Sequence, residues 1–224
     1  SAAGPRPASC RWRKPPPADF FILILELIGA AAFAVSGAMT GIRKNMDIFG
    51  ACVLGLTVAV GGGITRDIIL GAFPPAMFHD PIYAITAILT CFIVFIPRIR
   101  DFLEGNSILM LLADSIGLGI FTVSGAARAF DVTAEANVFL AVFVGVITGV
   151  GGGLLRDMMA GDPPYIFVKH IYATAAIAGA LLFCALRLCV PQHIAMLSGA
   201  ILIVAIRLLA SHYRWSLPKP GQRG

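Results

Sequence analysis

The sequence contains few charged residues. Only 13% of its 224 residues are Asp, Glu, Lys or Arg, whereas 58% are apolar, and the mean hydropathy is +0.87. A soluble domain of this size would carry about a quarter charged residues. The composition therefore predicts one compact domain that lies mostly in lipid, and it leaves no room for a separate soluble domain.

The sequence also lacks the motifs of enzymes, metal sites and nucleic-acid binding. It has no HExxH, no GxxxxGK[ST] and no CxxC, and its net charge of +5 comes without a basic surface interleaved with aromatic residues. We therefore expect no enzyme activity, no catalytic residue, no cofactor, no bound metal and no nucleic-acid partner. The five cysteines are interpreted as packing thiols: Cys10, Cys52, Cys91, Cys184 and Cys189.

Apolar segments near the ~20 residues needed to cross the hydrocarbon follow one another along the chain. We place seven, at residues 20–41, 48–71, 80–97, 107–128, 137–160, 169–189 and 193–212. Residues 1–19 form a basic, proline-rich tail that we expect to be disordered, and residues 213–224 form a C-terminal tail. The predicted fold class is an all-α membrane protein with seven transmembrane helices.

The chain contains one pattern twice. Gly61-Gly62-Gly63-Ile-Thr-Arg66-Asp67 recurs 90 residues later as Gly151-Gly152-Gly153-Leu-Leu-Arg156-Asp157, and Val-Ser-Gly-Ala occurs at 35–38 and 123–126. These matches predict a first three-helix repeat at 20–105, a second at 106–190 and an unpaired seventh helix at 191–212. Because three is odd, the second repeat enters the membrane inverted, and inverted repeats place transport sites at their midplane interface.

The two glycine triplets are expected to break the second and fifth helices. Glycine is about 1 kcal/mol worse than alanine in a helix, so three in a row would unwind the backbone at Gly61–Gly63 and at Gly151–Gly153. The freed carbonyls would then replace part of a cation's hydration shell. The alternative is close packing between helices through small residues.

Each triplet is followed by an arginine and an aspartate at membrane depth. Adjacent side chains on a helix point about 100° apart, so we expect Arg66 to reach Asp157 or the second triplet, and Arg156 to reach Asp67 or the first. These contacts would brace the crossing and line a pore. The alternative is a static ion pair that never meets a permeating ion.

Further polar residues lie inside the first and fourth segments. Glu26 and Asp114 are predicted to attract cations near the two mouths of the pathway, because carboxylates at this depth are usually functional; hydrogen bonding to neighbouring helices is the alternative. Ser36 and Ser124 either narrow the pore or bond back to their own helices.

Basic residues favour one orientation. With the N-terminus outside, eight Lys or Arg residues lie in inner loops and the C-terminal tail, against six outside. The positive-inside rule therefore predicts an outside N-terminus and a cytoplasmic C-terminus.

With its duplicated GGGxxRD motif inside a 3+3+1 arrangement, the chain resembles the trimeric intracellular cation (TRIC) channel family, specifically the prokaryotic branch. The resemblance covers residues 20–212. It implies a homotrimer in the prokaryotic plasma (inner) membrane, with membrane lipid as a partner and one pore per subunit between the two broken helices. It also implies permeation by monovalent cations, chiefly potassium, and suggests Arg128 as a gate.

Two functions stay open at this point. The first is a passive, potassium-permeable cation channel. The alternative is a secondary transporter for glycine or another small amino acid, because prokaryotic relatives also carry a glycine-transporter label.

Overall fold

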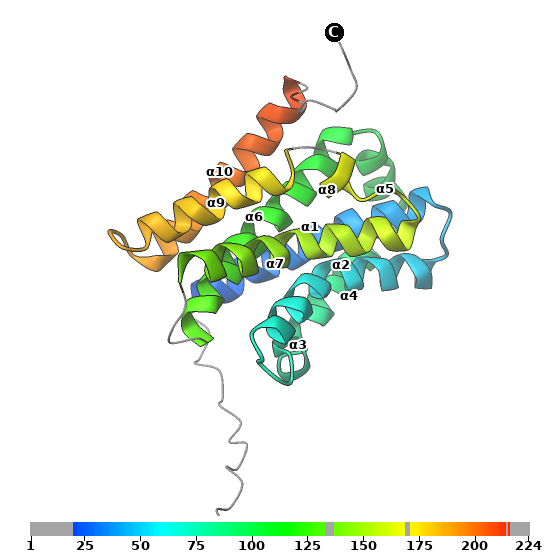
Figure 1. Ribbon diagram of the computed structural model, residues 1–224. Helices are drawn as coiled ribbons and strands as arrows, with labels where there is room; N and C mark the ends of the chain where they lie inside the picture. The colour runs from blue at the N-terminus through cyan, green and yellow to red at the C-terminus, as the bar shows by residue number, and fades with distance from the viewer. Residues whose placement is uncertain (1–19, 133–136, 169–170, 214, 216–224) are drawn as a thin grey trace, which may run out of the picture.

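The computed structural model describes residues 20–132, 137–168, 171–213 and 215, and this part of the chain is helical with connecting turns (Figure 1). The predicted N-terminal tail and most of the C-terminal tail lie outside the described residues. The helices are α1 (Phe20–Arg43), α2 (Ile48–Ile69), α3 (Ala76–His79), α4 (Ile82–Val94), α5 (Pro97–Glu104), α6 (Ser107–Val132), α7 (Val138–Ala160), α8 (Tyr165–Val168), α9 (Ala173–Leu186) and α10 (Gln192–His212).

Five of the described helices are long and apolar enough to cross a membrane, namely α1, α2, α6, α7 and α10. The other two expected spans are shorter than predicted. Helix α4 ends at Val94, and Pro97 starts α5 in a direction 85° away, so 80–97 is not one straight helix. Helix α9 has 14 residues, which cover only about 21 Å. Among the described residues, five helices are thus long and apolar enough to span a membrane, or six if the bent pair α4–α5 counts as one.

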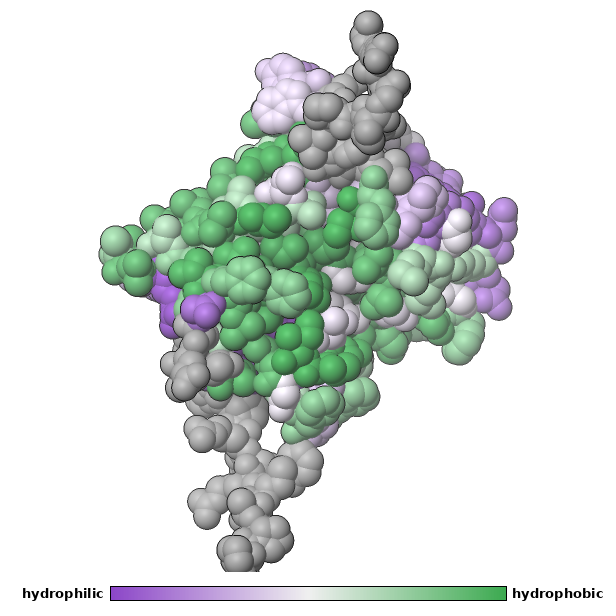
Figure 2. All heavy atoms as spheres, viewed as in Figure 1, coloured by the Kyte–Doolittle hydropathy of each residue, from purple (hydrophilic) through white to green (hydrophobic). Residues whose placement is uncertain are grey.

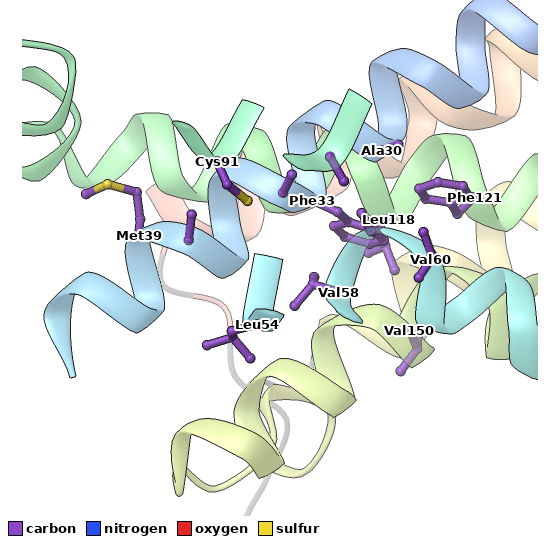
Figure 3. Packing of buried hydrophobic residues seen from close by; sticks show 14 of the residues in the cluster. Ala30, Phe33, Met39, Leu54, Val58, Val60, Cys91, Leu118, Phe121 and Val150 are labelled. Atoms are coloured by element: carbon purple, nitrogen blue, oxygen red, sulfur yellow. The ribbon is translucent and has the colours of Figure 1, made fainter. Parts of the chain in front are cut away.

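Four helices form the centre of the bundle, because α1, α2, α6 and α7 pack against one another. Helix α4 packs on α1 and α2, and α9 packs on α6 and α7, so the two halves share one arrangement. Helix α10 covers α6 and α9. In the central core, the Phe33 and Phe121 rings stack at 5.4 Å between centroids, and Cys91 and Val150 bring in α4 and α7 (Figure 3).

Large apolar side chains cover the outside of the bundle. Phe49, Phe139, Ile201 and Leu188 are each at least 65% exposed. Figure 2 shows apolar residues over most of the face in view, with hydrophilic residues mainly at its right edge and a smaller group at its left. At the face where α1 and α7 both end, Lys44 Nζ lies 2.5 Å from Asp162 Oδ1. The surface is that of a membrane protein, and the side to which each end is exposed stays a prediction.

Both glycine triplets lie inside unbroken helices, so the predicted breaks are wrong. Gly61–Gly63 belong to α2 and Gly151–Gly153 to α7. Thr65 Oγ1 donates a hydrogen bond of 2.9 Å to the Gly61 carbonyl, as in an ordinary helix. The loss of helix propensity is outweighed by tertiary packing.

The packing concerned is the crossing of α2 and α7. A β-carbon on Gly62 would collide with the carbonyl oxygen of Thr148, and one on Gly152 would collide with that of Val58. Only glycine allows the two backbones to approach so closely. The alternative interpretation of the triplets, close packing through small residues, therefore describes this structure. The carbonyl groups of the triplets stay within continuous helices.

Candidate functional site

Asp67 and Asp157 hold equivalent places after the crossing. Each Oδ1 accepts a hydrogen bond of 2.8 Å from Nε of the preceding arginine. Each Oδ2 accepts one of 2.8 Å from a backbone N–H at the start of the following short helix, from Ala76 in the first half and Tyr165 in the second. The aspartates thus tie each long helix to the loop that follows it.

The expected pairing of each arginine with the opposite aspartate is therefore wrong. Arg66 binds its own neighbour Asp67, and Arg156 binds Asp157. The 100° separation applies to the Cα–Cβ bonds, but an arginine side chain is long enough to curl back to an adjacent carboxylate. Nη1 of each arginine then faces the first helix of the same half, toward Glu26 for Arg66 and toward Asp114 for Arg156.

In the first half these groups form what we call the Glu26 cluster: Glu26, Arg66, Asp67, Tyr83 and Ser124. Tyr83 Oη donates 2.6 Å to Glu26 Oε2, and Ser124 Oγ donates to Glu26 Oε1. Arg66 Nη1 lies 3.7 Å from Glu26 Oε1. The cluster holds two carboxylates and one guanidinium group, so its formal charge is −1.

In the second half we define the Asp114 cluster as Asp114, Arg156, Asp157, Ser36 and Arg207. Arg156 Nη1 donates 2.6 Å to Asp114 Oδ1 and 2.6 Å to Ser36 Oγ. Arg207 Nη2 donates 2.6 Å to Asp114 Oδ2. With two carboxylates and two guanidinium groups, this cluster is formally neutral.

Each of the two serines contacts the ionic cluster of the other half. Ser36 lies on α1 but contacts Arg156 of the second half, whereas Ser124 lies on α6 but contacts Glu26 of the first half. Contact across the repeats therefore exists, although it runs through serine hydroxyls and not through arginine–aspartate pairs. Neither serine bonds back to its own helix.

The two clusters differ in access to water. A cavity of about 420 Å³ reaches the Glu26 cluster, and exposed Asp80 and Asp131 border it. Asp114, in contrast, is only 2% exposed, and Arg156 and Arg207 are 3% and 5% exposed. Two arginines enclose the Asp114 carboxylate in this structure, as expected from the alternative of hydrogen bonding to neighbouring helices. Attraction of cations by Asp114 stays a prediction.

The cavity lining is rich in acidic groups. Its charged groups are four carboxylates and two guanidinium groups, so the lining has a formal charge of −2. The carboxylates belong to Glu26, Asp67, Asp80 and Asp131, and the guanidinium groups to Arg66 and Arg128. Arg128 has no hydrogen bond or ion pair with another described residue and is half-buried at the cavity. Such a surface concentrates cations near its low-dielectric walls. The gating role of Arg128 stays a prediction.

Sequence reasoning missed two members of these clusters, Tyr83 and Arg207. Tyr83 donates to Glu26, and Arg207 donates to Asp114. It also missed Tyr172, which is 1% exposed and lies beside Arg207. The signal available for Arg207 was that a lone charge at membrane depth needs a counter-charge, and Glu26 and Asp114 are carboxylates inside apolar segments.

Comparison with known proteins finds a matching family model and similar membrane proteins. The family model described as "Glycine transporter" matches two stretches, residues 23–98 and 111–187. The inner membrane protein YadS of Escherichia coli K12, a UPF0126 protein, is 37% identical over 88% of this chain and 93% of its own.

Solved structures of cation channels share the fold. One, described as the structural basis for conductance through TRIC cation channels, is 39% identical with a TM-score of 0.78 and covers 90% of this chain and 98% of its own. The trimeric intracellular cation channel orthologue from Rhodobacter sphaeroides is 33% identical with a TM-score of 0.78, over 88% of this chain and 100% of its own. The chain therefore belongs to the prokaryotic branch of the TRIC channel family, which includes the UPF0126 membrane proteins.

Proposed function

We propose that this protein is a potassium-permeable channel for monovalent cations, with one pore per subunit. The observation that carries the proposal is the cavity of about 420 Å³ among apolar helices, whose lining has an excess of two carboxylates. A lining with net negative formal charge beside low-dielectric walls raises the local concentration of cations. It suits a pathway for cations.

The proposed path runs from this cavity past the α2–α7 crossing to the Asp114 cluster. The Glu26 cluster lines one half of the path, and Ser36, Asp114, Arg156 and Asp157 line the other. The glycine triplets form the narrow part between them, because α2 and α7 are in backbone contact there. The halves predicted at 20–105 and 106–190 thus each supply one side of the pore.

The assembly and location are part of the same proposal. The relative from Rhodobacter sphaeroides is described as a trimeric channel, and we infer a homotrimer for this chain as well. The relative from Escherichia coli is described as an inner membrane protein, which supports the plasma membrane, with the N-terminus outside and the C-terminus in the cytoplasm.

Recording from purified protein in planar bilayers tests the channel directly. In a potassium chloride gradient we expect unitary currents that reverse near the potassium equilibrium potential. Glu26→Gln keeps the side-chain shape and one of the two acceptor oxygens but removes one charge from the cavity. It should lower cation conductance by about fivefold, equivalent to roughly 1 kcal/mol for a single charge in a partly hydrated site.

Asp101→Asn is the matched control for the recording. It also removes one carboxylate, but Asp101 lies on α5 with a side chain 65% exposed and pairs only with its neighbour Arg100. Its conductance should equal that of the unsubstituted protein. Equal conductance of Glu26→Gln and Asp101→Asn would contradict the proposed pore lining.

A transporter of glycine or another small zwitterion is the second candidate. It is favoured by the family description and by the presence of Arg66 beside the acidic groups, since a guanidinium group can bind an amino-acid carboxylate. Saturable uptake of labelled glycine into proteoliposomes, without unitary currents, would establish this function and exclude the channel.

A further inference from the structure

The two clusters differ at one position that the repeat would make equivalent. The second oxygen of the Glu26 carboxylate accepts from the Tyr83 hydroxyl, at 2.6 Å. The second oxygen of the Asp114 carboxylate accepts from Arg207 Nη2, also at 2.6 Å. Tyr172 corresponds to Tyr83 in the repeat, yet its buried hydroxyl has no hydrogen-bond partner among the described residues. Arg207 therefore takes the place that the repeat assigns to Tyr172.

The displaced tyrosine fills space at the α2–α7 crossing. The Arg207 guanidinium carbon lies 4.5 Å from the centroid of the Tyr172 ring, and the Tyr172 hydroxyl lies against Gly153, where a β-carbon would collide with it. At the equivalent place in the first half, Gly63 borders the cavity, and a β-carbon there would meet only Arg66 Nη2, at 4.0 Å. Tyr172 thus occupies the volume that is open in the first half.

We propose that Tyr172 is the plug of the pore and that Arg207, from the unduplicated helix α10, is the latch that holds it. In the open state Arg207 leaves Asp114, and the Tyr172 hydroxyl donates to Asp114 as Tyr83 donates to Glu26. Tyr172 then no longer lies against Gly153, and water reaches the Asp114 cluster. This inference rests on the proposed channel function and assigns its gate.

The closed arrangement combines a favourable contact of Arg207 with an unfavourable burial of the Tyr172 hydroxyl. Arg207 gains a charge-assisted hydrogen bond and a stacking contact. The Tyr172 hydroxyl is buried with no partner in the described part of the chain, which is unfavourable. In the open arrangement the Tyr172 hydroxyl is hydrogen-bonded to Asp114, whereas the Arg207 guanidinium group loses its contact with Asp114 and is hydrated instead. Two states with compensating terms of this kind can be shifted by small changes on α10.

Open probability in bilayers is the first measurement. Arg207→Leu removes the latch, while Asp114 keeps its hydrogen bond from Arg156 and the cluster takes the formal charge of −1 that the Glu26 cluster has. The ratio of open to closed time should rise about tenfold or more, the change expected from loss of one hydrogen bond to a charged group. Tyr172→Phe in the Arg207→Leu background removes the hydroxyl that stabilises the open state, and should lower the ratio again. The same Tyr172→Phe change therefore distinguishes the plug from a general loosening of the fold.

Thiol labelling gives a readout that does not depend on conduction. With the native cysteines replaced by alanine, Ser36→Cys reports on the Asp114 cluster and Ser124→Cys on the open cavity. A water-soluble methanethiosulfonate reagent should label Ser124→Cys at the same rate with or without Arg207→Leu. It should label Ser36→Cys slowly when Arg207 is present and about tenfold faster with Arg207→Leu. If Arg207→Leu does not fold, Arg207→Lys, which cannot stack on Tyr172 as a planar group, should show a smaller change in the same direction.

The outcomes separate the two proposals. Faster labelling of Ser36→Cys without potassium current in any variant would support the latch and exclude the channel. Potassium current in the unsubstituted protein, with unchanged open probability and unchanged Ser36→Cys labelling in the Arg207 variants, would overturn the latch and keep the channel.

Discussion

Replacing Asp114 by alanine is expected to prevent the protein from reaching a folded, monodisperse state in detergent. Asp114 neutralises two arginines at once, since Arg156 and Arg207 each donate to it at 2.6 Å in a site where all three side chains are at most 5% exposed. Removing one partner of a buried ion pair destabilises a protein by about 3–5 kcal/mol. Here Arg207 would be left without a counter-ion and Arg156 would keep only Asp157. Size-exclusion chromatography after a temperature series measures the effect.

Two matched variants make this prediction specific. Glu26→Ala removes the corresponding carboxylate of the first half, but Arg66 keeps Asp67 and lies beside the water-accessible cavity. It should therefore lower the unfolding temperature much less. Combining Asp114→Ala with Arg207→Leu removes the orphaned charge and should recover part of the loss. An Asp114→Ala protein that unfolds at the temperature of Glu26→Ala would show that the Asp114 cluster is not a structural ion network.

Replacing Gly62 by alanine should separate α2 from α7. The added methyl group would overlap the Thr148 carbonyl, which is backbone and cannot rotate away. Overpacking of a tight interior costs about 1–3 kcal/mol, and occasionally more, and here the two central helices must move apart. The unfolding temperature in detergent should fall markedly, and Gly152→Ala, which would meet the Val58 carbonyl, should behave alike.

Gly63→Ala is the control, because it lies on the same helix one residue further. Its β-carbon would meet only Arg66 Nη2 at 4.0 Å, so the helix should gain up to about 1 kcal/mol of propensity without a collision. The unfolding temperature should stay constant or rise. If Gly62→Ala and Gly63→Ala destabilised the protein equally, the triplet would be required for unwinding, and the continuous helix would be wrong.

The sequence was most informative where a pattern was long or occurred twice. The five long apolar helices were predictable because hydropathy over about 20 residues is a strong signal. The duplicated motif located the central residues of the site, and Ser36, Ser124, Glu26, Asp114 and both Arg-Asp pairs do meet in two clusters. The contacts inside the clusters were harder to predict, because they depend on side-chain reach and not on residue spacing.

The errors have separate physical causes. Glycine propensity is a local property, whereas the contact of Gly62 with the Thr148 carbonyl joins residues far apart in the chain, and no local rule contains it. Pairing of Arg66 with its own neighbour was rejected from helix geometry that ignores the flexible arginine side chain. Arg207 has no counterpart in the other half, so comparison of the repeats could not identify its partner.

The exchange of Ser36 and Ser124 has a consequence for the origin of the chain. Each half completes its own ionic cluster with a hydroxyl group borrowed from the other, so one half alone would leave a buried donor or acceptor without its partner. An ancestor with one repeat would have needed two copies inserted in opposite directions to form both clusters, with the serine of each copy bonded to the ionic cluster of the other. Gene duplication and fusion would then have fixed this antiparallel pair in one chain. In such a chain the two halves can differ, as they do here at Arg207, whose ion pair among the described residues is with Asp114 of the second half.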